Sequence, residues 1–454
     1  MENEKLLVGY ARRAITPKLS VPLAGYGATH KRMSESVQDD LYATCIAFTQ
    51  GEKTILLFTQ DLIHTTAVWT TAARERLVPK TGVPAEHIFL CSTHTYSAPD
   101  IVSKLPCMDE YFADYLDALE EAALAALEDR APGEFYGTRT NVPMNHVRHY
   151  ILENGTYAGS NLGDFNSAPI AGHAEPNDPD MLLVKVAREE KPDILIVNYQ
   201  VHPTAASLVY KNMWRSVSAD FIAPLRENVE DVTGMHVAYF TGAAGNQVMG
   251  SKIPEERGNM SPEGFQRYGG GHKVVYAWRM AQYIYEALPK LQPLAGEGIE
   301  STQMMLERPV NHDDEEHAEI AKKTVEVWHN EGIVAGHKFA HEHGLASAFH
   351  ANAIINRLDR PKSKEMELNA VRIGPLAFTT LPYEVFASHG VYIKEHSPFP
   401  MTMVFSCTNG AWVYVPTEKA YDFKCYEACI SYFVKGTGEI VAEKLVDMLD
   451  RMKG

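Results

Sequence analysis

Three short segments of the sequence each carry a side chain that can bind a metal ion, at the point where a predicted strand ends. His94 lies in CSTHTYSAPD, His202 in VNYQVHPTAA and Glu384 in FTTLPYEVF. Side chains at the ends of neighbouring strands converge over one edge of a sheet, where open α/β sheets hold their ligands. Two imidazoles and one carboxylate suit zinc, which in many catalytic sites takes three protein ligands and leaves one position for water. On composition and spacing alone, however, these three residues would not be selected, because a lone histidine is more often an ordinary polar residue.

The segments that position these residues alternate between predicted strands and helices. Short apolar runs predict strands at 44–50, 53–60, 87–95, 180–187, 193–202 and from 236, with further strands within 368–384 and 401–417. Apolar residues at helical spacing predict helices at 70–82, 111–129 and 436–452. The segment 312–358 also has a helical pattern, and we expect it to cover the site or to form a subunit contact. The predicted fold is α/β, with a mixed β-sheet core flanked by helices.

Two irregular stretches, 154–180 and 251–272, are rich in Gly, Pro, Asn and Ser. Long loops inside a compact domain are often functional lids, and a surface insertion is the equally weighted alternative. The sequence contains no internal repeat, low-complexity tract or clear domain linker. We therefore expect residues 1–454 to form a single catalytic domain.

The segments that carry these residues, taken together and in order, resemble the N-terminal catalytic domain of the neutral/alkaline non-lysosomal ceramidase family. The shared segments are ARRAITPKLSVPLAGYG, VQDDLYATCIAF, LLFTQDLI, THTYSAPD, VHPT, LPYE and YVPTEKAYDFKCYEA. The resemblance covers nearly the whole chain and implies the fold of that domain. The family's usual C-terminal immunoglobulin-like domain is expected to be absent, because the chain ends soon after YEA.

This resemblance implies a zinc site and the residues that form it. The positions that match the family's zinc-binding residues are His94, His202, Glu384 and Tyr414. Tyr426 matches a tyrosine that lines the site. Arg148, in NHVRHY, falls where the family has a substrate-contacting arginine. An arginine there suits a carboxylate or a hydroxylated group, and a surface ion pair is the alternative at even weight.

Two positions depart from the family pattern. Tyr96 stands where the family has the second histidine of its THTHS segment, and Val248 in GNQVMG aligns with the active-site serine. A tyrosine, with a reference pKa of about 10, does not act as a base at neutral pH as histidine does. We therefore expect a divergent relative that acts on a small polar molecule rather than on ceramide.

The predicted function is a zinc-dependent hydrolase that cleaves an amide or related acyl bond of a small polar substrate by a metal-activated water. Zinc lowers the pKa of bound water towards about 7 and polarises a carbonyl group. Candidate hydrogen-bond donors are Tyr96, Tyr414 and Tyr426. Asn246 and the backbone amides of GAAGNQ form a candidate oxyanion hole, or else a plain Gly-rich connection. Two alternatives remain open: a zinc enzyme acting on a sugar, lactone or hydroxy-ketone, and a non-catalytic metal-binding protein.

Several other polar residues have a second interpretation. Asp61 and Asp220 are each expected either to orient a zinc-binding histidine or to cap a helix. His337 and His341 lie four apart on a predicted helix but lack a third ligand, so we interpret them as a solvated helix face. The six cysteines form no CxxC pair, and we interpret them as reduced and mostly structural: Cys45, Cys91, Cys107, Cys407, Cys425 and Cys429.

The composition limits the partners. The formal net charge of -16 disfavours nucleic acid and anionic lipid surfaces. No stretch approaches the roughly 20 apolar residues that span a bilayer, and the N-terminus lacks the apolar core of a signal peptide. We expect a cytoplasmic protein with a small-molecule substrate and no membrane insertion, and a homo-oligomer is compatible with the sequence.

Overall fold

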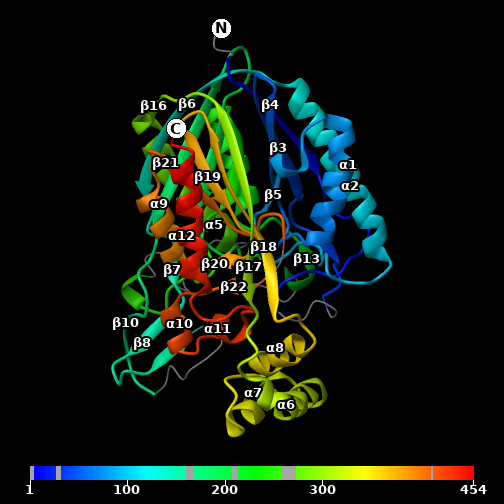
Figure 1. Cartoon of the computed structure of the whole chain (residues 1–454), viewed down its shortest axis with the longest axis vertical. Helices are drawn as coiled ribbons and strands as arrows, with labels where there is room; N and C mark the ends of the chain where they lie inside the picture. The colour runs from blue at the N-terminus through cyan, green and yellow to red at the C-terminus, as the bar shows by residue number, and fades with distance from the viewer. Residues whose placement is uncertain are drawn as a thin grey trace.

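The computed structural model describes residues 5–26, 32–159, 167–206, 213–256, 272–410 and 413–453. Its largest unit is a mixed sheet (Figure 1) with the strand order β14-β12-β11-β6-β1-β3-β4-β5, and β16 beside β6. The strands are β1 (Leu7–Ala14), β3 (Tyr42–Gln50), β4 (Lys53–Gln60), β5 (Ile88–Ser92), β6 (Ala131–Asn141), β11 (Asp180–Arg188), β12 (Ile194–Tyr199), β14 (His236–Thr241) and β16 (Gln292–Leu294). Neighbours run antiparallel except β12 with β14 and β4 with β5, which are parallel.

A second sheet packs against one face of the first. Its strands are β17 (Ile299–Pro309), β18 (Ser363–Ile373), β19 (Leu376–Thr380) and β21 (Met401–Phe405), in that order. Successive side chains of a strand point to opposite faces, and β3 shows how the faces divide. Ile46 and Phe48 enter the core shared with Phe378 and Met403 of the second sheet, whereas Cys45 enters the core beneath the helices. Because both faces are buried, β3 is apolar along most of its length.

Helices cover the outer faces of both sheets. The first sheet carries α1 (Ala67–Thr81), α2 (Cys107–Glu128), α3 (Ile222–Thr233) and α5 (His272–Ala287), and the second carries α9 (Ala387–His396) and α12 (Thr437–Arg451). In Figure 1, α1 and α2 lie on one side of the strands and α9 and α12 on the other. In α2, Tyr111, Tyr115, Leu119 and Ala122 are buried at helical spacing, which explains the pattern in the sequence. The predicted mixed sheet flanked by helices is confirmed.

Several short strands lie outside the two large sheets, and some of them carry residues of the predicted site. They are β2 (Ser36–Val37) with β13 (Ser216–Val217), β7 (His146–Val147) with β15 (Gln247–Val248), β20 (Glu384–Val385) with β22 (Tyr414–Val415), and the sheet of β8 (His149–Leu152), β9 (Tyr157–Gly159) and β10 (Ile170–His173). Of the two irregular stretches, the first contains β9 and β10, and its residues 160–166 lie outside the described ranges. In the second, 257–271 lie outside them, so the lid interpretation stays a prediction for both.

The segment 312–358 forms helices with a small core of their own. The helices are η7 (Glu315–His317), α6 (Ala318–Glu331), α7 (Ile333–Glu342) and α8 (Ala348–Leu358), and their core contains Ala321, Ala340, Leu345, Ala351 and Ile354. Figure 1 shows them at the lower end, next to α11 (Tyr426–Ile430), with α10 (Glu418–Asp422) beyond it. Arg357 donates to the Cys429 and Ser431 carbonyls at 3.0 and 2.8 Å. The Phe349 and Tyr426 ring centroids are 5.6 Å apart, so this segment supports one wall of the predicted site.

Among the residues that the structure describes, no helix combines the length and the apolar composition needed to cross a bilayer. His337 and His341 lie on α7 and bond the chain that follows it. The Ala348 N–H donates to His337 Nδ1 at 3.2 Å, and His341 Nε2 donates to the Ala346 carbonyl at 2.8 Å. All six cysteines are free thiols.

Candidate metal centre

His94 follows β5 and lies in a tight corner of the backbone. Its φ of +69° is uncommon for a residue with a side chain, and its N–H donates to the Leu62 carbonyl at 2.9 Å. Ring atom Nδ1 donates to the Ile63 carbonyl at 2.7 Å. Because Nδ1 donates in this bond, Nε2 is the ring nitrogen whose lone pair a metal ion takes once the imidazole is neutral.

His202 follows β12 and is held by one carbonyl group. Its backbone N–H and its ring Nδ1 both lie 3.0 Å from the Gln247 carbonyl oxygen. Although β14 and β5 stand at opposite ends of the strand order, Thr241 Oγ1 at the end of β14 donates to the Thr93 carbonyl at 2.7 Å. The sheet therefore curves until its two edges meet, and this curvature brings His94 and His202 together.

Glu384 opens β20 and completes the group. In the parallel pair of β20 and β22, Glu384 lies opposite Tyr414. Its Oε2 is 3.1 Å from His94 Nε2 and 3.0 Å from His202 Nε2. The three ligand atoms lie within 4.8 Å of one another, and all three residues are buried. Although Glu384 Oε2 lies 3.1 Å away, His94 Nε2 forms no well-directed hydrogen bond with any described residue, as expected for a buried nitrogen that serves a metal.

The charges of these three groups are coupled. Burial opposes ionisation of Glu384, but His94 and His202 outweigh it and hold the pKa of the carboxyl well below its usual range. Burial also opposes the charge on His94, but Glu384 raises the pKa of that imidazole. Burial and the charge of Arg148 lower the pKa of His202 to about 4. At neutral pH Glu384 is therefore an anion and His202 is neutral, which are the forms that bind metal.

Three tyrosines surround the histidines. The Tyr96 ring centroid lies 5.3 Å from that of His94 and 5.9 Å from that of His202. The Tyr414 ring lies 6.5 Å from His202, and Tyr426 lies 6.1 Å from Tyr414. Burial raises the pKa of all three phenols above the usual range. They stay protonated at neutral pH and act as hydrogen-bond donors.

No protein-family model matches the sequence, and no curated protein matches it at a significant level. Among solved structures, neutral ceramidase from Pseudomonas aeruginosa matches with a TM-score of 0.70 and 17% identity, over 99% of this chain and 75% of that one. A structure described as ceramidase complexed with C2 matches with a TM-score of 0.69 and 16% identity, over 99% of this chain and 76% of that one. The chain has the neutral ceramidase fold. The resemblance seen in the sequence segments is confirmed at the level of the fold.

On this ceramidase fold, Arg148 lies in the wall of the site. The residue is 8% exposed, its Nε donates to Glu427 Oε1 at 2.6 Å, and its Nη2 donates to the Gly245 carbonyl at 3.0 Å. The guanidinium carbon is 5.4 Å from the centre of the Tyr414 ring. The alternative of a surface ion pair is wrong, because the ion pair is buried. The role of Arg148 in substrate contact stays a prediction.

Glu427 forms a second buried charge cluster that the sequence did not reveal. Its Oε2 accepts a hydrogen bond from His149 Nε2 at 2.8 Å. Burial opposes its ionisation, but His149 and Arg148 lower the pKa of Glu427. Cys425 lies close enough to make a third potential metal ligand. However, burial raises the pKa of the Cys425 thiol well above its usual range. Since a neutral thiol is a poor ligand, we interpret this group as an ion-pair network that holds Arg148.

The network predicts how stability depends on pH. Burial opposes the charge on His149, but Glu427 raises the pKa of His149 to about 9. Because the pKa of His149 is raised on folding, its proton adds to the free energy of unfolding. This contribution is complete below the unfolded pKa of about 6.5 and is lost as pH rises through about 9. We expect the free energy of unfolding to fall by on the order of 3 kcal/mol from pH 6 to 9 relative to His149→Gln. Urea unfolding at three pH values measures it, and parallel curves for the two proteins would contradict it.

Asn246 does not present a free amide to the site. Its Oδ1 accepts the Ala387 N–H at 3.0 Å, and its Nδ2 lies 3.5 Å from Glu175 Oε2. The N–H groups of Gly245 and Gln247 donate to other backbone carbonyls. The segment GAAGNQ therefore fixes the neighbouring chain, which favours the plain Gly-rich connection over the candidate oxyanion hole.

Neither aspartate orients a histidine of the centre. Arg226 Nη1 and Nη2 donate to the carboxylate of Asp61 at 3.1 and 2.6 Å. Asp220 accepts the backbone N–H groups of Ala206 and Phe221 at 2.6 and 2.7 Å. Of the two alternatives for Asp61 and Asp220, the one in which they orient a zinc-binding histidine is wrong, because the Ile63 and Gln247 carbonyls accept from both Nδ1 atoms.

Two buried residues next to His94 were not among those predicted. Cys407 Sγ lies 3.6 Å from His94 Nδ1. Burial and the charge of His94 lower the pKa of His64 to about 3. His64 follows β4 as His94 follows its parallel neighbour β5. Since the ends of paired parallel strands share one edge of a sheet, that position was the available signal for His64.

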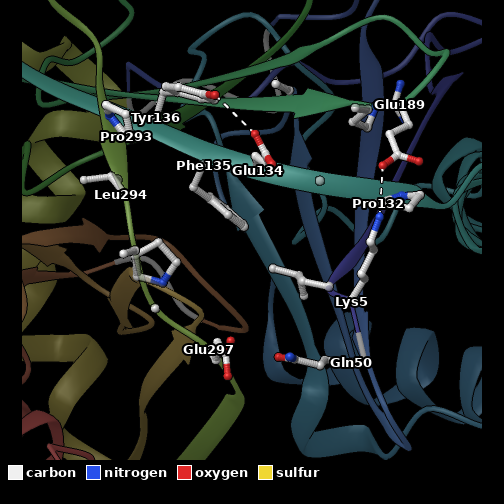
Figure 2. A pocket seen from close by; sticks show the side chains of 17 residues that line it. Lys5, Gln50, Pro132, Glu134, Phe135, Tyr136, Glu189, Pro293, Leu294 and Glu297 are labelled. Carbon is white, nitrogen blue, oxygen red and sulfur yellow. Dashed lines mark hydrogen bonds and ion pairs between the residues drawn. The ribbon is translucent and has the colours of Figure 1, made fainter. Parts of the chain in front are cut away.

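A separate cavity of about 770 Å³ is lined by the side chains drawn in Figure 2. Residues of β6, β16 and the N-terminal segment line it, and none of the predicted site residues does. Four of its polar groups form two pairs: Lys5 donates to Glu189 at 3.1 Å, and the Tyr136 hydroxyl donates to Glu134 at 3.2 Å. We therefore do not assign the chemistry to this cavity.

Gly245 allows close approach of the chain to β20. A Cβ atom there would lie 2.6 Å from the carbonyl oxygen of Glu384. Gly245→Ala is therefore expected to displace Glu384 and weaken metal binding about 10–100-fold, as measured by competition with a chelator. At Gly250 an added Cβ meets nothing within 4 Å, so Gly250→Ala is expected to stay within about twofold of the parent. Equal affinities for the two variants would show that the close approach is unimportant.

Proposed function

We propose that the chain is a metal-dependent hydrolase that cleaves an amide or related acyl bond of a small polar substrate, with zinc as its metal. The observation that supports this most is the convergence of His94, His202 and Glu384. They come from three distant parts of the chain, yet their ligand atoms lie within 4.8 Å of one another in a buried position. The ceramidase fold, found in a family of amide hydrolases, agrees with this reaction class.

The donor set fits zinc. Two imidazole nitrogens and one carboxylate leave one position of a tetrahedral ion open, and buried His94 Nε2 forms no well-directed hydrogen bond with any described residue. Zinc bound here would supply a Lewis acid for the substrate carbonyl and lower the pKa of water. The Ile63 and Gln247 carbonyls orient the two rings, and outer partners of this kind strengthen metal binding.

The chain's own donors suit a developing negative charge. Tyr96 and Tyr414 stay protonated because burial raises the pKa of each phenol. In our proposal one of them donates a hydrogen bond to the oxygen that gains charge as the acyl carbon is attacked. Arg148, fixed by Glu427, adds a positive charge that attracts a polar or anionic substrate.

Valine at position 248, where the family has a serine, favours attack on the acyl carbon by water. Val248, which aligns with the family serine, lies in β15 opposite His146 and has no group that forms an acyl intermediate. Polar phenols and a guanidinium around the centre favour a small hydrophilic substrate over a lipid. The proposed substrate is therefore not ceramide.

A substrate panel tests the proposal. The metal-loaded protein is assayed with short N-acyl amides, esters, lactones, sugar derivatives and long-chain ceramide, with the chelator-treated protein as control. We expect turnover of a short amide or ester that chelation abolishes and added Zn²⁺ restores. Turnover confined to sugars or hydroxy-ketones, or a preference for ceramide, would contradict the proposal.

A further inference from the structure

A second group of histidines and a carboxylate lies outside the candidate centre. His146 comes from β7, His173 ends β10, and Glu256 ends η4 (Pro254–Glu256). His146 Nδ1 lies 3.4 Å and His173 Nε2 lies 2.7 Å from the same Glu256 oxygen. The ligand atoms of the three residues all lie within 4.8 Å of one another. Three separate segments of the chain thus direct metal-binding atoms to one point.

The side chains are held in place and still reach solvent. The Tyr150 ring packs against His173, with centroids 4.9 Å apart, and the two imidazoles are nearly parallel at 14°. The Ser251 hydroxyl hydrogen-bonds to Glu256 and orients its carboxylate. Side-chain exposures of 13%, 18% and 33% for His146, His173 and Glu256 leave an ion access from outside, unlike the buried centre.

Hydrogen bonding alone explains this cluster poorly. Both imidazoles lie against the same oxygen of Glu256. A metal ion between the three side chains would let each of them bind as a separate ligand. Imidazole and carboxylate together suit zinc and similar first-row divalent ions.

We propose that His146, His173 and Glu256 form a second metal site, which binds a zinc-like divalent ion and ties β7, β10 and η4 together. The site has a direct connection to the candidate centre. Val147, next to His146, pairs with Gln247, whose carbonyl holds His202. An ion at the second site would therefore stiffen the frame of the first centre without contact with the substrate.

Metal counting in matched variants tests this site independently of catalysis. Parent, His146→Ala/His173→Ala, His202→Ala and the control His337→Ala/His341→Ala are each loaded with Zn²⁺ alone, dialysed and analysed by mass spectrometry of the metal. Far-ultraviolet circular dichroism verifies that each variant is folded. We expect two equivalents in the parent and control, and one in each of the other two variants. Zn²⁺ should also raise the Tm of the parent more than that of His146→Ala/His173→Ala.

Two results would overturn the second site. One is equal zinc content in the parent and His146→Ala/His173→Ala. The other concerns Glu256→Gln, which keeps the shape of the side chain: full zinc content in that variant would show that the carboxylate is not a ligand. If His202→Ala lost zinc and His146→Ala/His173→Ala did not, the second site would be eliminated and the proposed function would stand. The two proposals therefore fail separately.

Discussion

Replacing His202 by alanine is expected to remove one equivalent of metal and to lower kcat/KM for the hydrolysed substrate by at least about 1000-fold. The metal contributes several kcal/mol of transition-state stabilisation, and each 1.36 kcal/mol corresponds to a factor of ten. His202 is buried, and its Nε2 lies 3.0 Å from Glu384, so the substitution removes one of the three side-chain ligands of the centre. Metal analysis and steady-state kinetics on the same preparations measure both effects.

A matched histidine gives the control. His236 begins β14 and lies beside the start of β12, the strand that leads to His202. The His236 ring stacks on Tyr10, with centroids 4.2 Å apart. It lies at the opposite end of these strands from the centre. His236→Ala is expected to lower stability while retaining the metal and most of kcat/KM. If His202→Ala bound as much metal as His236→Ala, the centre would be assigned to the wrong residues.

Removing the charge of Glu427 is expected to destabilise the fold more than any other single change proposed here. The carboxylate is 1% exposed and bonds both Arg148 and His149. In Glu427→Gln, His149 can lose its proton, but the Arg148 guanidinium cannot and stays charged and buried. Breaking a buried ion pair in this way costs about 3–5 kcal/mol, which urea unfolding at pH 7 measures.

An exposed ion pair provides the comparison. Lys5 and Glu189 lie 3.1 Å apart, with side chains 71% and 64% exposed. Glu189→Gln is expected to change the free energy of unfolding by less than about 1 kcal/mol. A similar small change for Glu427→Gln would mean that water reaches Arg148 and that the network does not position it.

The sequence predicted local structure better than it predicted packing. The hairpin of β3 and β4 and the helix α2 follow from short-range patterns: a polar turn at Gly51 and buried positions at helical spacing. The packing of the second sheet and the hydrogen bond between Thr241 and Thr93 do not follow from such patterns. Such contacts join residues far apart in the chain, and no local pattern encodes them.

The site shows the same division. His94, His202 and Glu384 were selected because their segments resemble a family, not because of their spacing. Glu427 was missed although its neighbour Tyr426 was predicted, because a lone glutamate in a short helix has no distinguishing pattern. The partners of Asn246 were also unpredictable, since its amide bonds Ala387, 141 residues further along. Hydrogen-bond partners of this kind become visible only once the fold has brought the segments together.

The most direct test of the metal centre is X-ray diffraction from crystals of the zinc-loaded protein, measured on both sides of the zinc absorption edge. We predict an anomalous peak about 2.0–2.2 Å from His94 Nε2, His202 Nε2 and a carboxylate oxygen of Glu384. Crystals of protein that retains zinc in solution, but with no anomalous peak among these three side chains, would contradict the account.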